Sequence, residues 1–316
     1  MRAALVTATS GPSGIEIRDV PEPTGEILVD IHAVGISWPD LLLSKGEYQL
    51  KPELPFILGV DAAGVVRHDA GGFKAGDRVA LCGGYGGAAE TVATGADFVF
   101  GLPDELSFAQ GAALPMNYLT AEFALRERAQ VRTGETVLVH GAAGGVGTAT
   151  LQVAKGLGAR TIAVVSSPEK AEVARQAGAD EVVMVEGFRD AVRELAPTGV
   201  GVVVDVVGGD LFTDSLRCLG DQGRLMVVGF TGRSIPEVKV NRLLLNNIDV
   251  RGVGWGAYAM MRPGYMRQQW DRLVPMMTAG LIDPPLGPVR PLEEISEVLL
   301  EMEQRQTLGK SVLAVR

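Results

Sequence analysis

The sequence predicts a two-domain α/β fold, with a compact β-barrel-like domain and a parallel sheet covered by helices on both faces. The chain has 316 residues, 47% of them hydrophobic, which is enough for two domains with a core each. Its N-terminal third consists of short β-rich runs broken by Gly, Pro and Asp, which is typical of a small β domain. Farther along, Val-rich runs alternate with helical segments, as in a parallel sheet buried on both faces.

The β-rich part extends from Met1 to about Gly101. Its clearest predicted strands are residues 27–34, 64–66 and 78–81. After Pro103 the pattern changes, because residues 107–128 are apolar at helical spacing around a break at Pro115. The last segment, residues 270–316, returns to helix and strand patterns and ends in a predicted strand at 311–315.

Regular alternation of strands and helices begins at Thr136. The predicted strands are residues 136–140, 160–165, 181–185, 201–207, 223–229 and 249–253. The predicted helices are residues 145–157, 168–177 and 211–219, and Gly178 is expected to end the second.

The charge balance excludes several classes of partner. The formal net charge is −9 and the pI is about 5.0, and no run of Lys and Arg interrupts this acidic balance. Nucleic acid and anionic membranes are attracted by basic surfaces, so we expect neither as a partner. A small molecule is the expected partner.

The N-terminus and the cysteines favour a cytoplasmic protein. Residues 1–10 hold only a short apolar stretch before Gly11 and Pro12, which is too brief for a signal peptide. No apolar run approaches the roughly 18 residues that span a bilayer. Cys82 and Cys218 lie far apart without metal-site spacing, and we interpret both as ordinary thiols.

The strongest motif is the glycine-rich run from His140 to Gly147, which follows a strand and opens a helix. A dinucleotide pyrophosphate needs close approach of the backbone and the unpaired amides of a helix N-terminus. Gly144, Gly145 and Val146 are placed to supply those amides, while Gly147 lets the helix pack closely on the strand. A tight turn of purely structural use would look similar, but the flanking strand and helix favour dinucleotide binding.

The next strand indicates which nicotinamide cofactor binds. Sites that prefer NAD usually carry Asp or Glu about 20 residues after the glycines. Here the strand tip has no acid, and Ser166, Ser167 and Lys170 offer hydroxyls and a cation for a 2′-phosphate. Ser167 also fits as a helix cap, and Glu169 lies close by. We expect NADPH rather than NADH.

Several segments, in their order and spacing, resemble the zinc-free quinone oxidoreductase branch of the medium-chain dehydrogenase/reductase superfamily, to which the zinc-type alcohol dehydrogenases also belong. They are residues 35–40, 55–64, 76–79, 117–121, the glycine loop and 205–208. The resemblance implies a GroES-like catalytic domain made of residues 1–115 and 257–316. A Rossmann NADPH-binding domain, with a doubly wound parallel sheet, is expected to be inserted into it as residues 116–256, and the active site is expected in the cleft. The resemblance also implies a homodimer formed by an edge strand near residues 248–253.

Zinc alcohol dehydrogenases of this superfamily have a ligand Cys where this chain has Ser37 and a ligand His where it has Val60. Valine cannot coordinate a metal, and zinc sites need enough Cys, His or carboxylate ligands. The cysteine-rich lobe that holds a structural zinc is also missing, because Cys82 stands alone. We therefore expect no metal.

Without a Lewis acid, hydride transfer is expected to reach an acceptor that is already electrophilic, such as a quinone or a conjugated carbonyl. The resemblance places Ser37 where many relatives have Asn near the nicotinamide, and places Asn117 and Thr120 near its ribose. Phe230 and Trp255 are expected to wall the cofactor pocket, and Arg305 to reach the 2′-phosphate. The other positions expected on the cofactor side end strands: Val207, Gly229 and Val253.

Tyr48 distinguishes the leading function from its alternative. The segment around it resembles the part of enoyl thioester reductases that carries their tyrosine proton donor, and a phenol stays protonated at neutral pH. In many quinone reductases a tyrosine at this place only lines the cleft. The sequence thus leaves three functions open: quinone reduction, reduction of an enoyl or acryloyl thioester, and cofactor binding without catalysis as a sensor or structural protein.

Overall fold

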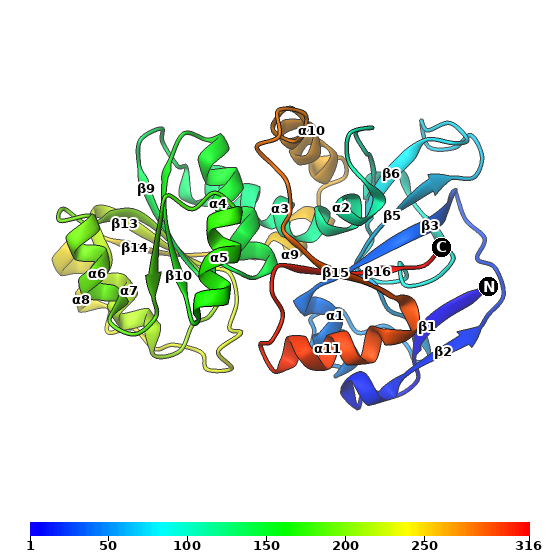
Figure 1. Cartoon of the computed structure of the whole chain (residues 1–316), viewed down its shortest axis with the longest axis horizontal. Coiled ribbons are helices and arrows are strands. Elements are labelled where there is room, and N and C mark those ends of the chain that lie inside the picture. Colours follow the sequence, from blue (N-terminus) through cyan, green and yellow to red (C-terminus); the bar gives the residue numbers. More distant parts are fainter. The chain divides into compact units, whose positions relative to one another are not determined.

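The computed structural model describes residues 1–316, which form two compact units (Figure 1). The first unit comprises residues 1–117, 263–278 and 286–316, and the second comprises residues 118–262 and 279–285. The short segment 279–285 belongs to the second unit, where the side-chain amide of Gln152 bonds both backbone groups of Asp283.

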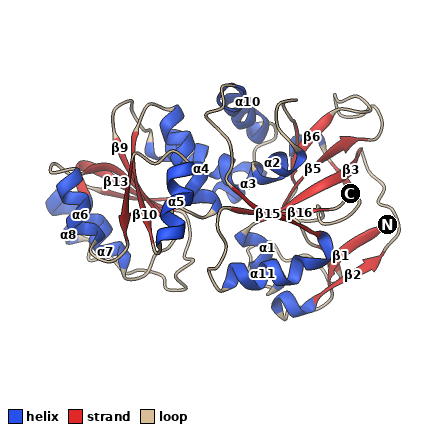
Figure 2. Cartoon of the chain, in the orientation of Figure 1, coloured by secondary structure: helices blue, strands red, loops and turns tan.

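Two mainly antiparallel sheets form the first unit (Figure 2). The larger has seven strands in the order β15-β16-β3-β5-β6-β8, with β7 paired to β3, and the smaller has the order β2-β1-β4. The strands are β1 (Arg2–Val6), β2 (Ile15–Asp19), β3 (Ile27–Ile36), β4 (Phe56–Ile57), β5 (Asp61–Val66), β6 (Arg78–Cys82), β7 (Thr91–Thr94), β8 (Val99–Gly101), β15 (Leu286–Pro291) and β16 (Lys310–Ala314). The helices of this unit are η1 (Gly11–Gly14), α1 (Trp38–Ser44), η2 (Ala96–Phe98), α2 (Phe108–Ala113), α10 (Tyr265–Thr278), η4 (Leu292–Glu294) and α11 (Ile295–Glu303).

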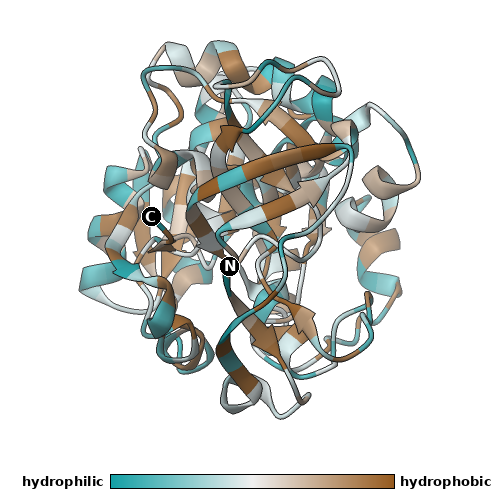
Figure 3. Ribbon diagram, turned by 90° about the vertical axis from the view of Figure 1, so that its right-hand side faces the viewer, coloured by the Kyte–Doolittle hydropathy of each residue, from teal (hydrophilic) through white to brown (hydrophobic).

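Strand β3 shows why this segment folds as a sheet strand. Its first residues alternate, with Ile27, Val29 and Ile31 fully buried and the residues between them half-buried, as expected where one sheet face meets a core. Figure 3 shows brown, hydrophobic residues concentrated on the strands of this side of the molecule. The two termini lie in this unit, and Arg2 donates a hydrogen bond to the carbonyl of Val315 at 3.2 Å.

The second unit is built on a six-stranded parallel sheet in the order β11-β10-β9-β12-β13-β14 (Figure 2). The strands are β9 (Thr136–His140), β10 (Arg160–Val165), β11 (Glu181–Met184), β12 (Val200–Asp205), β13 (Leu219–Val227) and β14 (Asp249–Gly252). The helices are η3 (Phe123–Ala129), α4 (Gly145–Gly156), α5 (Pro168–Gln176), α6 (Phe188–Leu195), α7 (Leu211–Cys218), α8 (Asn241–Asn246) and α9 (Trp255–Met260), and α3 (Pro115–Glu122) joins the two units.

The central strands of this sheet are buried along their length, as the Val-rich runs predicted. Val137, Leu138 and Val139 of β9 have no exposed surface, and neither have residues 202–204 of β12. The predicted α/β fold, with a doubly wound parallel sheet and a separate β-rich domain, is confirmed. No helix of the molecule combines the length and apolar character that crossing a membrane requires.

The details that differ from the prediction include the start of β13 and the type of the helix after Glu122. Strand β13 begins at Leu219, directly after α7, instead of at Gly223. The helical segment after Glu122 is a π-helix, and arginine side chains bond the carbonyls at its end: Arg251 donates to Arg128 O, and Arg224 donates to Ala129 O. These partners come from strands far along the chain, so local spacing could not indicate the wider helix.

Candidate functional site

The predicted glycine loop forms a close junction between β9 and α4. Gly141 adopts φ +61°, and a Cβ there would lie 2.7 Å from Val206 Cγ2. A Cβ on Gly147 would lie 2.2 Å from the carbonyl oxygen of Gly141, a distance that no side chain tolerates. The loop therefore needs glycine at both positions, as the tight strand-to-helix turn of a dinucleotide site does.

The amides of this loop are not all available to a ligand. The N–H of Gly144 bonds the carbonyl of Gly141 at 3.0 Å, so in this structure that amide closes the turn of the loop. Gly144 is the exposed N-cap of α4, and the amides of Gly145 and Val146 belong to the first turn, where a helix has no internal acceptors. Because Gly144 has no side chain, the approach to this end of α4 stays open.

The polar residues predicted to bind the 2′-phosphate lie together just after the C-terminal end of β10. Lys170 Nζ donates to Ser166 Oγ at 3.1 Å, and Ser167 Oγ caps α5 by accepting from the amide of Lys170 at 3.3 Å. Ser166 is exposed and Lys170 is half-buried. Glu169 is exposed, and bonds from Ser167 and the backbone lower its pKa, so it stays ionised beside this cluster.

The other residues predicted near the cofactor in this unit follow the carboxyl ends of neighbouring parallel strands. In a parallel sheet these ends meet at one edge, where α/β proteins bind their ligands. Phe230 is 38% exposed, whereas Trp255 is 3% exposed and packed at the start of α9. Three residues flank them in the loops after β12, β13 and β14: Val207, Gly229 and Val253.

Helix α3 carries Asn117 and Thr120 one turn apart, and both are buried at 5% and 7% exposure. Its start is held from the first unit, because the amide of Met116 donates to Asp61 Oδ1 at 2.9 Å. A carboxylate at a helix N-terminus also complements the helix dipole. Arg305, expected to reach a phosphate, is exposed after α11 with φ +60°.

A buried polar network surrounds Ser37 in the first unit. The ammonium of Lys310 donates to Ser37 Oγ at 2.5 Å and to Asp61 Oδ2 at 2.8 Å, and Ser37 Oγ donates to the same Asp61 oxygen at 3.0 Å. The sequence analysis missed Lys310. Its only signal is a basic residue at the start of an otherwise apolar strand.

Asp40 lies next to this network. Its carboxylate accepts the backbone amides of Ser37, Gly59 and Val60 at 2.8 to 3.1 Å. Complete burial raises the pKa of Asp40 to about 7, even though the amides of Ser37 and Val60 oppose the shift.

Tyr48 and Cys82 interact electrostatically with the same two carboxylates, those of Asp40 and Asp61. Burial raises the pKa of the half-buried Tyr48 phenol, and Cys82, Asp40 and Asp61 raise it further. Burial and Asp61 likewise raise the pKa of the Cys82 thiol well above its ordinary value. Both groups are therefore held in their protonated forms.

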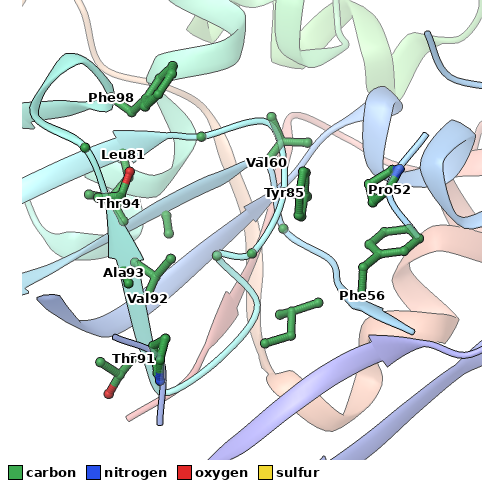
Figure 4. Close-up of a pocket in the computed structure, with 18 of the residues that line it drawn as sticks. Pro52, Phe56, Val60, Leu81, Tyr85, Thr91, Val92, Ala93, Thr94 and Phe98 are labelled. Carbon is green, nitrogen blue, oxygen red and sulfur yellow. The ribbon is translucent and has the colours of Figure 1, made fainter. Parts of the chain in front are cut away.

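An apolar pocket of about 780 Å³ opens beside this region (Figure 4). Phe56 and Tyr85 meet edge to face with ring centroids 6.0 Å apart, and Figure 4 shows the strand of Val92 across from them. Gly59 and Val60 line the pocket and also donate to Asp40. Asp40 thus joins the pocket wall to Ser37. The molecule contains no group of three or more His, Cys, Asp or Glu side chains arranged to hold a metal.

His140, at the end of β9, has no exposed surface. Ser215 Oγ donates its proton to Leu211 O at 2.7 Å, so it accepts from His140 Nε2, which lies 2.8 Å away. Nδ1 has no hydrogen-bond partner. Burial lowers the pKa of His140 to about 4, so the imidazole is neutral at neutral pH and serves as a packed core residue.

The sequence was also compared with known proteins. It matches the family model described as alcohol dehydrogenase GroES-like domain over residues 23–104, and the one described as zinc-binding dehydrogenase over residues 145–278. Quinone oxidoreductase-like protein 2 of Bos taurus is 38% identical over 323 residues, covering 100% of this chain and 93% of that protein.

Solved structures agree over the whole chain. A probable oxidoreductase from Mycobacterium abscessus has a TM-score of 0.91 and 41% identity, covering 100% of this chain and 99% of the other. The Escherichia coli quinone oxidoreductase complexed with NADPH has a TM-score of 0.90 and 29% identity, with full coverage of both chains. The chain is therefore an oxidoreductase that belongs to the quinone oxidoreductase branch of the medium-chain dehydrogenase/reductase superfamily.

Proposed function

We propose that this protein is a zinc-independent NADPH:quinone oxidoreductase that transfers hydride from NADPH to quinones or similar small electrophiles. The observation that carries the proposal is the buried Ser37–Asp61–Lys310 network beside an apolar pocket. A lysine ammonium, hydrogen-bonded to Ser37, lies where related enzymes would need metal ligands. A second cation beside this ammonium would be repelled, and Val60 offers no ligand atom.

The glycine junction and the β10 tip support NADPH as the cofactor. When bound, NADPH supplies the hydride from C4 of its nicotinamide. The amides of Gly145 and Val146 would hold its pyrophosphate, and Ser166, Ser167 and Lys170 would bind its 2′-phosphate. Further residues are proposed around the rest of the cofactor: Asn117, Thr120, Gly144, Val207, Gly229, Phe230, Val253, Trp255 and Arg305.

Lys170 gives a direct test of the cofactor preference. We expect Lys170→Ala to weaken NADPH binding about tenfold and to leave NADH binding nearly unchanged, because only NADPH carries the 2′-phosphate. Cofactor fluorescence titrations would measure both. Arg175→Ala, at the far end of the same helix, is the matched control. Equal weakening of both cofactors by Lys170→Ala would contradict the assignment.

The pocket of the first unit supports a flat, mostly apolar acceptor. Its volume suits a small molecule, and the edge-to-face pair Phe56–Tyr85 offers aromatic surface to a quinone ring. Reduction of a quinone needs no metal, because the negative charge that hydride brings is delocalised onto oxygen. The protein has to orient the reactants, exclude water and offer hydrogen bonds to that oxygen.

Tyr48 favours a second candidate function, the reduction of an alkene conjugated to a thioester. Its phenol is kept protonated by burial and by the carboxylates nearby, so it could donate to the carbon of an enolate. Quinone reduction places its protons on oxygen, whereas alkene reduction also needs one on carbon.

The deciding experiment follows NADPH oxidation with a simple para-quinone and, separately, with a short enoyl-CoA, with a chelator present throughout. Faster turnover of the quinone, unaffected by the chelator, supports the proposed function. Dominant turnover of the thioester supports the second candidate. In that case Tyr48→Phe should abolish alkene reduction and spare quinone reduction, whereas equal loss of both would exclude Tyr48 as a proton donor.

We also propose that the protein forms a homodimer along β14, the edge strand of the parallel sheet. An edge strand presents unpaired backbone groups that a second copy can continue. The adjoining segment exposes large apolar side chains, with Leu244 and Leu245 of α8 exposed at 77% and 74% and Ile235 at 75%. Apolar side chains gathered in this way are typical of an interface.

A further inference from the structure

The apolar pocket of the first unit is built by that unit alone. Its main walls are the segments on either side of β4, the loop that follows β6, and β7. No residue of the second unit, which carries the proposed sites for the pyrophosphate and the 2′-phosphate, lines it. Its volume of about 780 Å³ lies in the range typical of small-molecule sites. The walls of the pocket therefore do not depend on a bound cofactor.

The side chains that line the pocket carry almost no charge. None of them is Lys, Arg or His, and the exposed Glu53 is the one charged side chain. Met1 also lines the pocket, and its ammonium donates to the carbonyl of Val20 at 2.8 Å. An anionic group that entered would lose its water without gaining the side chain of a cation as a partner. The lining therefore favours an uncharged ligand.

Tyr85 presents an aromatic ring to this pocket from a glycine-rich loop. Gly84 and Gly86, on either side of it, adopt φ +86° and +100°, where glycine is favoured because it has no Cβ. The amide of Gly86 donates to the carbonyl of Ile57 at 2.9 Å, which fixes the loop next to the ring. The side chain of Tyr85 is 43% exposed, so aromatic surface is free for a ligand.

Phe56 fixes the orientation of the Tyr85 ring. It is 6% exposed and meets Tyr85 edge to face, with the ring centroids 6.0 Å apart. The residue after Phe56 is Ile57, whose carbonyl holds the loop of Tyr85. The partner of the ring and the anchor of its loop thus come from adjacent residues. A ring that is already oriented loses little conformational freedom when a flat ligand packs on it.

The opposite wall supplies a hydroxyl that the protein itself does not use. Thr94 is the last residue of β7 and lines the pocket, and Figure 4 shows it across from Tyr85. Its hydroxyl makes no hydrogen bond within the protein, whereas the hydroxyl of Thr91, on the same strand, bonds both Asp30 and Arg67. The free hydroxyl of Thr94 can donate to a carbonyl oxygen.

We propose that Tyr85 and Thr94 are the residues that select the acceptor. The ring of Tyr85 contacts an uncharged planar molecule, and the hydroxyl of Thr94 donates to one of its carbonyl oxygens. This inference rests on the proposed quinone reduction and names the substrate class, which is neutral quinones and excludes anionic ones. Because the first unit supplies these contacts, the acceptor binds with or without the cofactor.

The test measures binding to the protein without cofactor by equilibrium dialysis. The neutral probe is tetramethyl-para-benzoquinone, whose methyl groups block the addition of thiols to the ring. The anionic probe is the same quinone with a carboxymethyl group in place of one methyl group, and the methyl ester of that acid is the uncharged control of similar size. Comparing the acid with its ester separates the effect of charge from that of volume.

The variants remove the ring or the hydroxyl and then restore each. Tyr85→Leu and Thr94→Val are the disruptive variants, and Tyr85→Phe and Thr94→Ser are the conservative ones. Leu308→Ala is the matched control, because Leu308 is 42% exposed in the same unit but lies outside the pocket. Urea unfolding of each variant is measured alongside.

We expect Tyr85→Leu to bind the neutral probe about tenfold more weakly, as the loss of an aromatic contact predicts. Thr94→Val should bind it about fivefold more weakly, as the loss of a hydrogen bond predicts. Tyr85→Phe and Thr94→Ser should retain most of the affinity, and Leu308→Ala should change it less than about twofold. The unmodified protein should bind the acid at least about tenfold more weakly than its ester.

Three results would each overturn the inference: no binding of the neutral probe, the same affinity in the disruptive variants as in the unmodified protein, or equal affinity for the acid and its ester. NADPH oxidation with the neutral probe separates this inference from the proposed function. If the expected binding pattern is found but NADPH is not oxidised, the quinone reductase activity is wrong and the ring site stands. If the probe is reduced with the same KM in Tyr85→Leu and Thr94→Val, the acceptor binds elsewhere, so the inference fails while the proposed function stands.

Discussion

The ammonium of Lys310 lies 2.8 Å from Asp61 Oδ2, and the exposed fractions of the two side chains are only 3% and 0%. The same carboxylate holds Ser37 Oγ and, through its other oxygen, the amide of Met116. One buried carboxylate thus joins β16, the start of α1 and the start of α3, the helix that carries Asn117 and Thr120.

Removing the charge of Asp61 should therefore lower the free energy of unfolding far more than removing a surface charge does. We expect Asp61→Asn to lower the free energy of unfolding by about 3 to 5 kcal/mol, because it leaves the buried ammonium of Lys310 without a counter-charge. Urea unfolding measures this. Glu172→Gln, which breaks the exposed pair with Arg175 on α5, is the control and should change stability by less than about 0.5 kcal/mol. Similar effects of the two variants would contradict the picture of a tightly buried pair.

The sequence analysis identified one residue of this network and missed the others. Ser37 was considered because it stands at the position of a metal ligand in related enzymes. Lys310 was not, because 249 residues separate it from Asp61 and only the antiparallel pairing of β16 with β3 brings them together. Local spacing predicts elements, whereas contacts between distant strands depend on sheet order.

The glycine loop offers a pair of substitutions that separate folding from cofactor binding. We expect Gly147→Ala to destabilise the protein by at least about 1 to 3 kcal/mol, because its Cβ would lie 2.2 Å from Gly141 O. Gly144→Ala should keep the melting temperature, because its φ of −88° suits any residue and its Cβ would approach Gly141 O no closer than 3.4 Å.

Thermal unfolding and NADPH titration would be measured on both variants. Gly144→Ala should still bind NADPH at least tenfold more weakly, since its methyl group would project at the helix end where the pyrophosphate is proposed. Normal NADPH affinity in Gly144→Ala would place the pyrophosphate elsewhere.

Here the sequence predicted the strand, loop and helix with nearly the observed boundaries, because periodicity and glycine spacing are local. It did not show that the loop uses the amide of Gly144 for its own turn to Gly141. A hydrogen bond of this kind depends on the backbone angles of the loop, and composition does not specify them. Ser167 could be predicted correctly as a helix cap, because that motif is local. The same residue caps α5 and is also proposed to bind the 2′-phosphate.

His140 should make the protein less stable in acid. Its pKa is about 4 in the folded state and about 6.5 when unfolded, so below about pH 6.5 the unfolded chain binds a proton that the folded chain refuses. Stability is therefore lost as the pH falls from about 6.5 to 4, by about 3 kcal/mol in total at 1.36 kcal/mol per pK unit.

Urea unfolding at a series of pH values would measure this loss. His140→Leu removes the titrating group and should reduce the acid-induced loss by that amount, while His68→Gln, at an exposed histidine, should leave it unchanged. An identical pH dependence in His140→Leu and the unmodified protein would mean that the buried imidazole is not the acid-sensitive group.

The proposed dimer along β14 predicts that single charges at the exposed leucines of α8 separate the two copies. Leu244→Glu places a carboxylate in a surface that pairing would bury, and a buried unpaired charge costs several kcal/mol, enough to shift association by a factor of 100 or more. Because Leu244 is 77% exposed within one chain, the substitution should leave the fold and melting behaviour of the chain intact. Light scattering after gel filtration would report the mass, with Leu300→Glu on α11 as the control, since Leu300 is also exposed but lies in the first unit. A dimer for Leu300→Glu and a monomer for Leu244→Glu would support pairing along the sheet edge, whereas a dimer that survives Leu244→Glu unchanged would assign the interface to another face.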